Sequence, residues 1–278
     1  MTVIRTIILL ILLIAIAVLV SSAVYQVVSS PPAPDIPPTP DTGQTTQQLT
    51  VEDAKRIVSE FSGDTVDTIS YLETIEFPIG NQYIFSSPSG AYYVNVQTGI
   101  IEMALFHPAR EHSGTIVYSQ DEAREIARTY AEQNFPHFRD VNMTLIDEKL
   151  LDHGNGGYEY EFYWAVVREG VLTPSIVIIS INPSSGEVMG FKAVHRDVLI
   201  PLKPEIQEED VETRALTAFP GIEPVEIHSF LSVSVDSGNQ TLIWNIEVKG
   251  KPKEGIVQGG IVIIDAITGE ILFVDHYQ

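Results

Sequence analysis

The run IVIIDAITGEILFVDHY, residues 261–277, decides the fold class. It consists of a β-rich segment, a polar turn that contains Gly269, and a second β-rich segment. Glycine supplies the positive φ that a tight hairpin turn requires. The same plan occurs twice more, as YYVNVQTGIIEMAL around Gly99 and as IVIISINPSSGEVMGFKAV around Gly186. Three copies of one hairpin predict an internal repeat.

An alternating strand precedes the second and third hairpins. In YEYEFYWAV, residues 158–166, every second side chain is large and apolar, and LIWNIEV, residues 242–248, repeats this pattern. The only two tryptophans of the chain, Trp164 and Trp244, lie 22 and 25 residues before the turn glycine, and we interpret them as equivalent positions. Because alternation is typical of a half-buried strand, we expect this face to be core beneath a helix rather than a ligand surface. The first unit has a shorter counterpart, YIFSSPSG, residues 83–90.

Each β-rich part follows a predicted helix. The three helical segments are TVEDAKRIVSEFSG, SQDEAREIARTYAEQNFP and QEEDVETRALTAFPG, which begin at residues 50, 119 and 207. A polar residue and an acidic cluster open each one, as the positive end of the helix dipole favours. Apolar residues then recur at helical spacing and form one buried stripe. The fold class is therefore α+β, with each unit a helix packed on an antiparallel β-meander.

This arrangement resembles the PepSY domain family. The resemblance is carried by the acidic-capped helix, seen as EDAKRIVSEF and DEAREIARTY, and by the terminal hairpin, seen as VNVQTGII, ISINPSSGEV and IIDAITGEI. It covers about residues 50–277 as two or three tandem copies. The family occurs in prokaryotic envelope and secreted proteins, including propeptides of thermolysin-like metalloproteases, so the resemblance implies inhibition or regulation of a protease. The sequence shows no protease domain, so the protease would be a separate chain.

The N-terminal region predicts membrane attachment. Residues 6–28 include an uncharged run long enough for a transmembrane helix, and Arg5 before it predicts a cytoplasmic N-terminus. We favour an uncleaved signal-anchor, although Ser21 and Ala23 also fit a peptidase that cuts after Ala23 and releases a secreted protein. The predicted organisation is a cytoplasmic N-terminus, a transmembrane helix, a Pro/Thr-rich linker and three PepSY-like units, at residues 1–5, 6–28, 29–49, 50–112, 113–200 and 201–278.

Composition excludes several classes of protein. The chain has 278 residues and a net charge of −21, whereas a nucleic-acid binder needs a basic face. It contains no cysteine, so disulfides, thiolate zinc sites and cysteine nucleophiles are absent. The charge instead favours basic partners and disfavours anionic lipid head groups.

No residue pattern predicts an enzyme or a cofactor site. Asp41-Thr42-Gly43 matches the aspartic-protease triplet, but it lies in the Pro/Thr-rich linker without a second copy. The acidic run from Glu205 to Glu212 lacks the spacing of a calcium loop and is interpreted as a solvated helix start. The sequence has no H-E-x-x-H and no G-x-S-x-G motif, and its seven histidines are scattered. They are His107, His112, His137, His153, His195, His228 and His276.

The sequence leaves two function classes open. The first is a membrane-anchored extracytoplasmic interaction module that regulates an envelope protease, and the second is a structural or ligand-sensing cell-surface ectodomain. We predict no catalytic, metal or cofactor residues and no nucleic-acid partner. Asn142 and Asn239 match the N-glycosylation acceptor pattern and are predicted modification sites if the location permits it.

Overall fold

The computed structural model describes residues 49–77, 80–107, 114–154, 157–236, 238–253 and 256–277. The predicted transmembrane helix, most of the predicted linker and the Asp41-Thr42-Gly43 triplet lie outside the described residues. Within the described ranges, no helix combines the length and the hydropathy that a membrane crossing needs.

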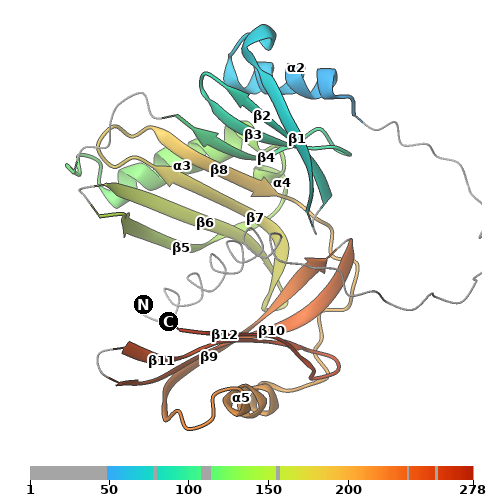
Figure 1. Ribbon diagram of the computed structural model, residues 1–278, viewed down its shortest axis with the longest axis vertical. Coiled ribbons are helices and arrows are strands. Elements are labelled where there is room, and N and C mark those ends of the chain that lie inside the picture. The colour runs from blue at the N-terminus through green and yellow to red at the C-terminus, as the bar shows by residue number, and fades with distance from the viewer. Residues whose placement is uncertain are drawn as a thin grey trace, which may run out of the picture.

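The described chain contains three successive units, each with an α-helix followed by four strands (Figure 1). In units 1 and 2 a short second helix lies between the first helix and the strands. Unit 1 comprises α2 (Val51–Ser62), the 3-10 helix η1 (Val66–Thr68), β1 (Ser70–Phe77), β2 (Gly80–Ser87), β3 (Gly90–Asn95) and β4 (Ile101–Phe106). Unit 2 comprises α3 (Gln120–Asn134), the short α4 (His137–Asp140), β5 (Met143–Asp152), β6 (Tyr158–Arg168), β7 (Val171–Ile181) and β8 (Val188–Val194). Unit 3 comprises α5 (Glu208–Thr217), β9 (Pro224–Asp236), β10 (Asn239–Lys253), β11 (Ile256–Asp265) and β12 (Ile271–His276).

Each unit is an antiparallel meander, and the units join into one large mixed sheet. The strand order runs β1-β2-β3-β4-β8-β7-β9-β10-β11-β12, and β6 pairs with both β5 and β7. Units 1 and 2 meet edge to edge through β4 and β8. Unit 3 is connected to them by a single parallel bridge, Leu172 to Ser232. The predicted α+β class is confirmed.

The predicted helix caps explain where α2 and α3 begin. The Thr50 hydroxyl accepts from the Asp53 N–H at 3.1 Å, and Ser119 and Glu122 form a reciprocal capping box. Helix α2 ends at Gly63, whose φ of 78° is the left-handed conformation of a C-cap. Helix α5 begins after Gln207 without a side-chain cap and relies on its acidic first turn.

Two separate cores lie beneath these helices. Units 1 and 2 share one core, because rings from both units meet at the β4–β8 junction. Phe61 of α2 lies 5.9 Å from Phe191 of β8, and Phe106 of β4 lies 6.1 Å from Tyr130 of α3, measured between ring centroids. A second core lies in unit 3 and includes Trp244, together with Val171 at the start of β7.

The aromatic strand β6 is buried on both of its faces, which corrects the expectation of a half-buried strand. Phe162 and Trp164 belong to the shared core as predicted. On the opposite face, Tyr163 is 3% exposed and Ala165 is fully buried. Apolar side chains of β5 and β7 pack around these two residues.

Candidate interaction surface

Each hairpin turn is shaped by an Asn or Asp side chain, which the apolar pattern of the sequence did not reveal. Asn95, Asn182 and Asp265 lie four residues before the turn glycine of their unit. Their backbone carbonyls accept from the glycine N–H at 2.9, 2.8 and 2.9 Å. Their side-chain oxygens accept from backbone N–H groups inside the turn at 2.8 to 3.0 Å. The signal is visible in VNVQTG, INPSSG and IDAITG, and it reflects the ability of Asn and Asp to close a turn on their own backbone.

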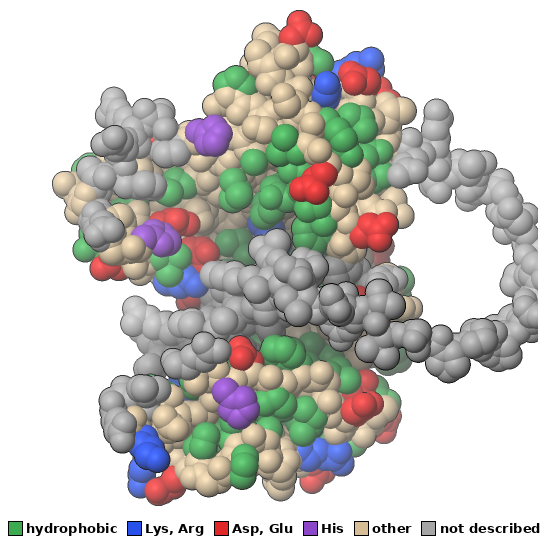
Figure 2. All heavy atoms as spheres, in the orientation of Figure 1, with side chains coloured by type: hydrophobic (Ala, Val, Ile, Leu, Met, Phe, Trp, Pro, Cys, Tyr) green, Lys and Arg blue, Asp and Glu red, His purple; other side chains and the backbone are tan. Residues whose placement is uncertain are grey.

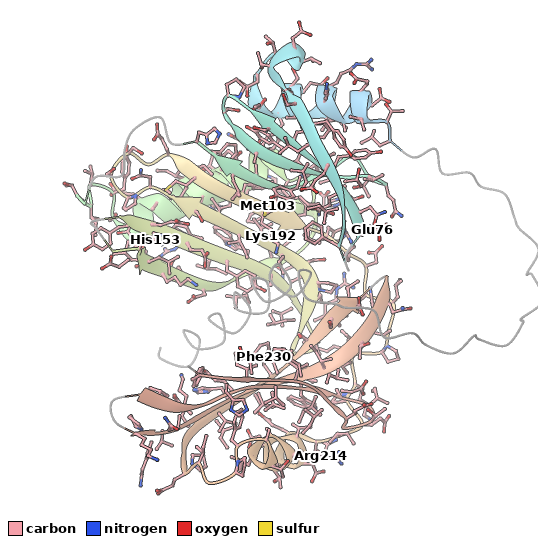
Figure 3. The ribbon with its side chains drawn as sticks, in the orientation of Figure 1. Glu76, Met103, His153, Lys192, Arg214 and Phe230 are labelled. Atoms are coloured by element: carbon pink, nitrogen blue, oxygen red, sulfur yellow. The ribbon has the colours of Figure 1, made fainter. Side chains whose placement is uncertain are left out.

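The next residue of each turn binds the start of the helix. The carbonyls of Val96, Pro183 and Ala266 accept from the backbone N–H two residues before the helix, at 3.2, 2.9 and 3.0 Å. Each unit therefore fastens its last hairpin to the entry of its own helix. In unit 3 the contact is reinforced, because the Arg214 guanidinium donates to the Gly269 carbonyl at 2.7 Å; Figure 3 shows Arg214 on α5.

A β-bulge follows each turn at the same position. The pairing register skips one residue, three positions after the turn glycine, at Glu102, Met189 and Leu272. A bulge re-aims the side chains that follow it and changes the local twist. Consequently β4, β8 and β12 leave their turns with the same geometry.

The three turn glycines themselves have φ of 71°, 74° and 73°. This left-handed region is strained for other residues. At Gly186 a Cβ atom would also lie 2.9 Å from the ring of Tyr118.

The strand register does not make the two tryptophans equivalent, which corrects our interpretation of them. Trp244 pairs with Ile264, five residues before its turn glycine. Trp164 pairs with Val177, which lies nine residues before the turn glycine of unit 2. In unit 3 the residue at that distance pairs with Val248, so Val248 is the true counterpart of Trp164. Both tryptophans are nevertheless core residues, at 4% and 7% exposure.

The junction between units 1 and 2 pairs equivalent positions of the repeat. Ala104 of β4 lies opposite Phe191 of β8, and both residues come five positions after their turn glycine. Met103 lies opposite Lys192, and Leu105 lies opposite Gly190, so position four pairs with position six in both directions. Figure 3 shows Met103 and Lys192 side by side at this junction. The pairing is therefore locally two-fold symmetric, as in an isologous contact.

A buried polar cluster strengthens this junction. The carboxylate of Glu102, which is 2% exposed, accepts from Gln82 Nε2 at 2.6 Å and from Asn95 Nδ2 at 3.1 Å. It also accepts from the Arg196 guanidinium at 2.6 Å, which ties unit 1 to the segment after β8. Burial lowers the pKa of Lys192, and the nearby Glu102 carboxylate opposes that shift. Glu102, the bulge residue of unit 1, thus stabilises the contact between unit 1 and the segment after β8.

One serine and one histidine meet in the structure although the sequence predicted no such pair. The Ser175 hydroxyl lies 2.9 Å from His195 Nδ1 and donates to the Arg196 carbonyl at 3.1 Å. Ser175 is 2% exposed, and His195 Nε2 lies 4.0 Å from the exposed Asp197 carboxylate. Because a nucleophile must reach its substrate, the buried Ser175 hydroxyl does not fit that role. The contact instead fastens β7 to the segment after β8.

His195 is also stacked on His137, with ring centroids 4.4 Å apart. Burial and the neighbouring imidazole of His137 lower the pKa of His195, and Asp197 partly opposes this. The neutral form is therefore favoured at neutral pH.

Other predicted positions do not assemble into a site. In the described part of the chain, no group of three or more His, Asp or Glu side chains is arranged to hold a metal ion. Two surface hollows of about 400 and 350 Å³ lie beside α3 and share Tyr130. Asn142 and Asn239 are both exposed, at the turn before β5 and at the start of β10.

The surface that distinguishes unit 3 is the outer edge of β12. Among the described residues β12 pairs only with β11, whereas its counterparts β4 and β8 pair with each other. Ile271, Leu272 and Phe273 are 39%, 49% and 40% exposed. Apolar side chains are visible on the surface of unit 3 and of the units above it (Figure 2). An edge strand presents unpaired N–H and C=O groups, which makes it a docking site for another strand.

The fold defines an α+β protein built from repeated helix-plus-meander units. Residues 205–275, which span unit 3, match the model of the PepSY family, described as "Peptidase propeptide and YPEB domain". The predicted resemblance to the PepSY family is therefore confirmed for this part of the chain, and PepSY domains are generally non-catalytic. Among solved structures, the chain is similar to the Bacillus megaterium YpeB C-terminal domain, with a TM-score of 0.41 and 19% identity over 83% of this chain and 99% of that chain. No curated protein matches the sequence.

Proposed function

We propose that the chain is a non-catalytic interaction module of three PepSY-like units that regulates an envelope protease. The observation that carries this proposal is the repeat itself. The turn, the contact with the helix start and the bulge of the PepSY domain at residues 205–275 recur in units 1 and 2. The recurring positions are turn, capping and core residues, which serve a binding scaffold rather than a reaction.

The protease part of the proposal is supported by the family description, which names peptidase propeptides. A propeptide-like module acts by binding, and the exposed edge of β12 offers backbone groups to an extended segment of the protease. The net charge of −21 favours a basic surface on the partner and predicts an association rate that falls as salt rises.

An inhibition assay tests the protease part. The full chain in detergent is titrated against zinc metallopeptidases and serine peptidases of the cell envelope, with a quenched peptide as substrate. We expect dose-dependent inhibition of at least one peptidase, and loss of that inhibition with heat-unfolded chain. No inhibition across the panel would contradict regulation of a protease and favour the structural or ligand-sensing ectodomain.

We place residues 6–28 across the membrane and the three units on the extracytoplasmic side. Because the chain has no cysteine, single cysteines report topology directly. Glu76→Cys, at an exposed position labelled in Figure 3, should react with a membrane-impermeant maleimide in intact cells. Thr2→Cys is the matched control and should react only after lysis. The opposite pattern, or a chain that fractionates as soluble without N-terminal processing, would overturn the anchored topology.

A further inference from the structure

The edge of β12 has a counterpart inside the same molecule that shows what can pair with it. In units 1 and 2, the strands that follow the turn glycine pair with each other, antiparallel, about the position five residues after the glycine. In unit 3 this position is Val274. Strand β12 leaves its turn with the same bulge as β4 and β8 but has no such neighbour among the described residues.

We propose that β12 pairs with β12 of a second copy of this chain and reproduces the β4–β8 junction between two molecules. The two-fold axis then passes beside Val274, which lies opposite the second copy's Val274. Phe273 lies opposite Asp275 of the second copy, just as Met103 lies opposite Lys192 within one chain. This inference goes beyond the proposed function because it concerns self-association, and a chain paired in this way would compete with a protease segment for the edge of β12.

The backbone of β12 is oriented for this contact. The Tyr277 N–H donates to the Gly259 carbonyl of β11. Because the N–H and C=O groups of a strand alternate in direction, those of Val274 and His276 point away from β11. These groups face outward without a strand partner among the described residues, and a second β12 would satisfy them in pairs.

Two other edges of the described sheet, those of β1 and β5, are better protected against pairing. Proteins shield edge strands with charged side chains. Strand β1 carries Glu73 and Glu76, and β5 has four charged residues within Met143–Asp152. Strand β12 has an uncharged apolar run from Ile271 to Val274 and a single carboxylate, Asp275. Of these three edges, that of β12 is the least shielded, and it is the one that matches the internal junction.

Cysteine crosslinking tests the register, since the chain has no cysteine of its own. Differently tagged Phe273→Cys and Asp275→Cys full chains are mixed in detergent micelles and oxidised. Directly opposite residues are close enough for a disulfide, whereas two copies of either variant alone place their cysteines on a diagonal. We expect the mixed disulfide and little homodimer from either variant alone. Equal crosslinking in all combinations, or in a control mixture of Glu73→Cys and Ile75→Cys on β1, would indicate random collision and overturn the proposal.

A pair of charge substitutions tests the same contact without crosslinking. Phe273→Glu places two carboxylates opposite each other at both symmetric positions, whereas Phe273→Lys places an ammonium opposite Asp275. Both variants replace the same exposed ring with a charge, and in a Trp164→Phe background the fluorescence of Trp244 checks that unit 3 is folded in each. Like charges directly opposite each other destabilise a strand pair, and opposite charges stabilise it. We therefore expect the dimer dissociation constant of Phe273→Glu to exceed that of Phe273→Lys by about tenfold or more. Equal dimerisation of the two variants, or a monomeric wild-type chain by light scattering at all concentrations, would refute the inference.

Discussion

The replacement Phe191→Ala probes whether units 1 and 2 share a core that unit 3 does not. Phe191 is 2% exposed, pairs with Ala104 across the junction, and lies 5.9 Å from the Phe61 ring and 5.7 Å from the Tyr130 ring. Burial of an aromatic side chain removes about 150–250 Å² from water. At about 25 cal/mol per Å² this corresponds to about 4–6 kcal/mol. Since alanine recovers part of this burial, we expect a loss of about 3–5 kcal/mol.

The two tryptophans make this prediction measurable, because each core contains one of them. In a fragment of residues 49–278, Trp244→Phe leaves Trp164 as the reporter of the shared core, and Trp164→Phe leaves Trp244 as the reporter of unit 3. With a guanidinium m-value of about 4 kcal/mol/M, Phe191→Ala should lower the midpoint reported by Trp164 by about 1 M.

The midpoint reported by Trp244 is the internal control and should move much less. Equal shifts of both midpoints would mean that the three units unfold as one cooperative body and would refute the separation into two cores. If the midpoint reported by Trp164 shifts by less than about 0.2 M, Phe191 does not contribute to the stability of the shared core.

Single contacts give three further tests. Gly186→Ala and Gly154→Ala both replace a residue with φ of 74°, but only at Gly186 would the new Cβ lie 2.9 Å from a side chain, that of Tyr118. In denaturant titrations we expect Gly186→Ala to lower the free energy of unfolding by about 1–3 kcal/mol more than Gly154→Ala does. Equal losses would contradict a steric clash with Tyr118. Glu102→Gln weakens a buried charged contact and should lower the free energy of unfolding by about 1.5–3 kcal/mol, whereas an unchanged value would show that the carboxylate is dispensable. Burial lowers the pKa of His195 from 6.5, so the unfolded state binds a proton at this residue more readily than the folded state does. Stability should therefore fall as the pH drops through 6.5, and between about pH 7 and 5 the thermal midpoint of His195→Gln should fall less steeply than that of the wild type. The same pH dependence in both proteins would exclude His195 as the cause.

Local features of the fold could be predicted from the sequence because each depends on a few neighbouring residues. Thr50 and Ser119 cap their helices as expected. The turn glycines also adopt the positive φ that a hairpin requires. The Asx residue of each turn was within reach of the same reasoning, since its spacing from the glycine is constant, but a pattern of apolar residues and glycine alone passes over it.

The site residues that the sequence could not reveal come from distant parts of the chain. Glu102 and Arg196 are separated by 94 positions, and Ser175 and His195 by 20. The equivalence assigned to Trp164 and Trp244 failed for a related reason. Two residues join β6 to β7 and two join β10 to β11, so the difference between 22 and 25 residues along the chain places the two tryptophans at different pairs of the register, which only the strand pairing shows.

The sequence by itself determined that the chain is α+β, that a helix opens each unit and that one glycine turn recurs three times. Only the tertiary structure decided that β4 pairs with β8, that units 1 and 2 share a core, and that β12 has no second strand partner among the described residues. The physical reason is that caps and turns are local, whereas an edge strand offers the same backbone hydrogen-bonding groups to any other edge. The three strands that follow the turn glycine leave it with one geometry, and the packing of whole units decides which of them meet.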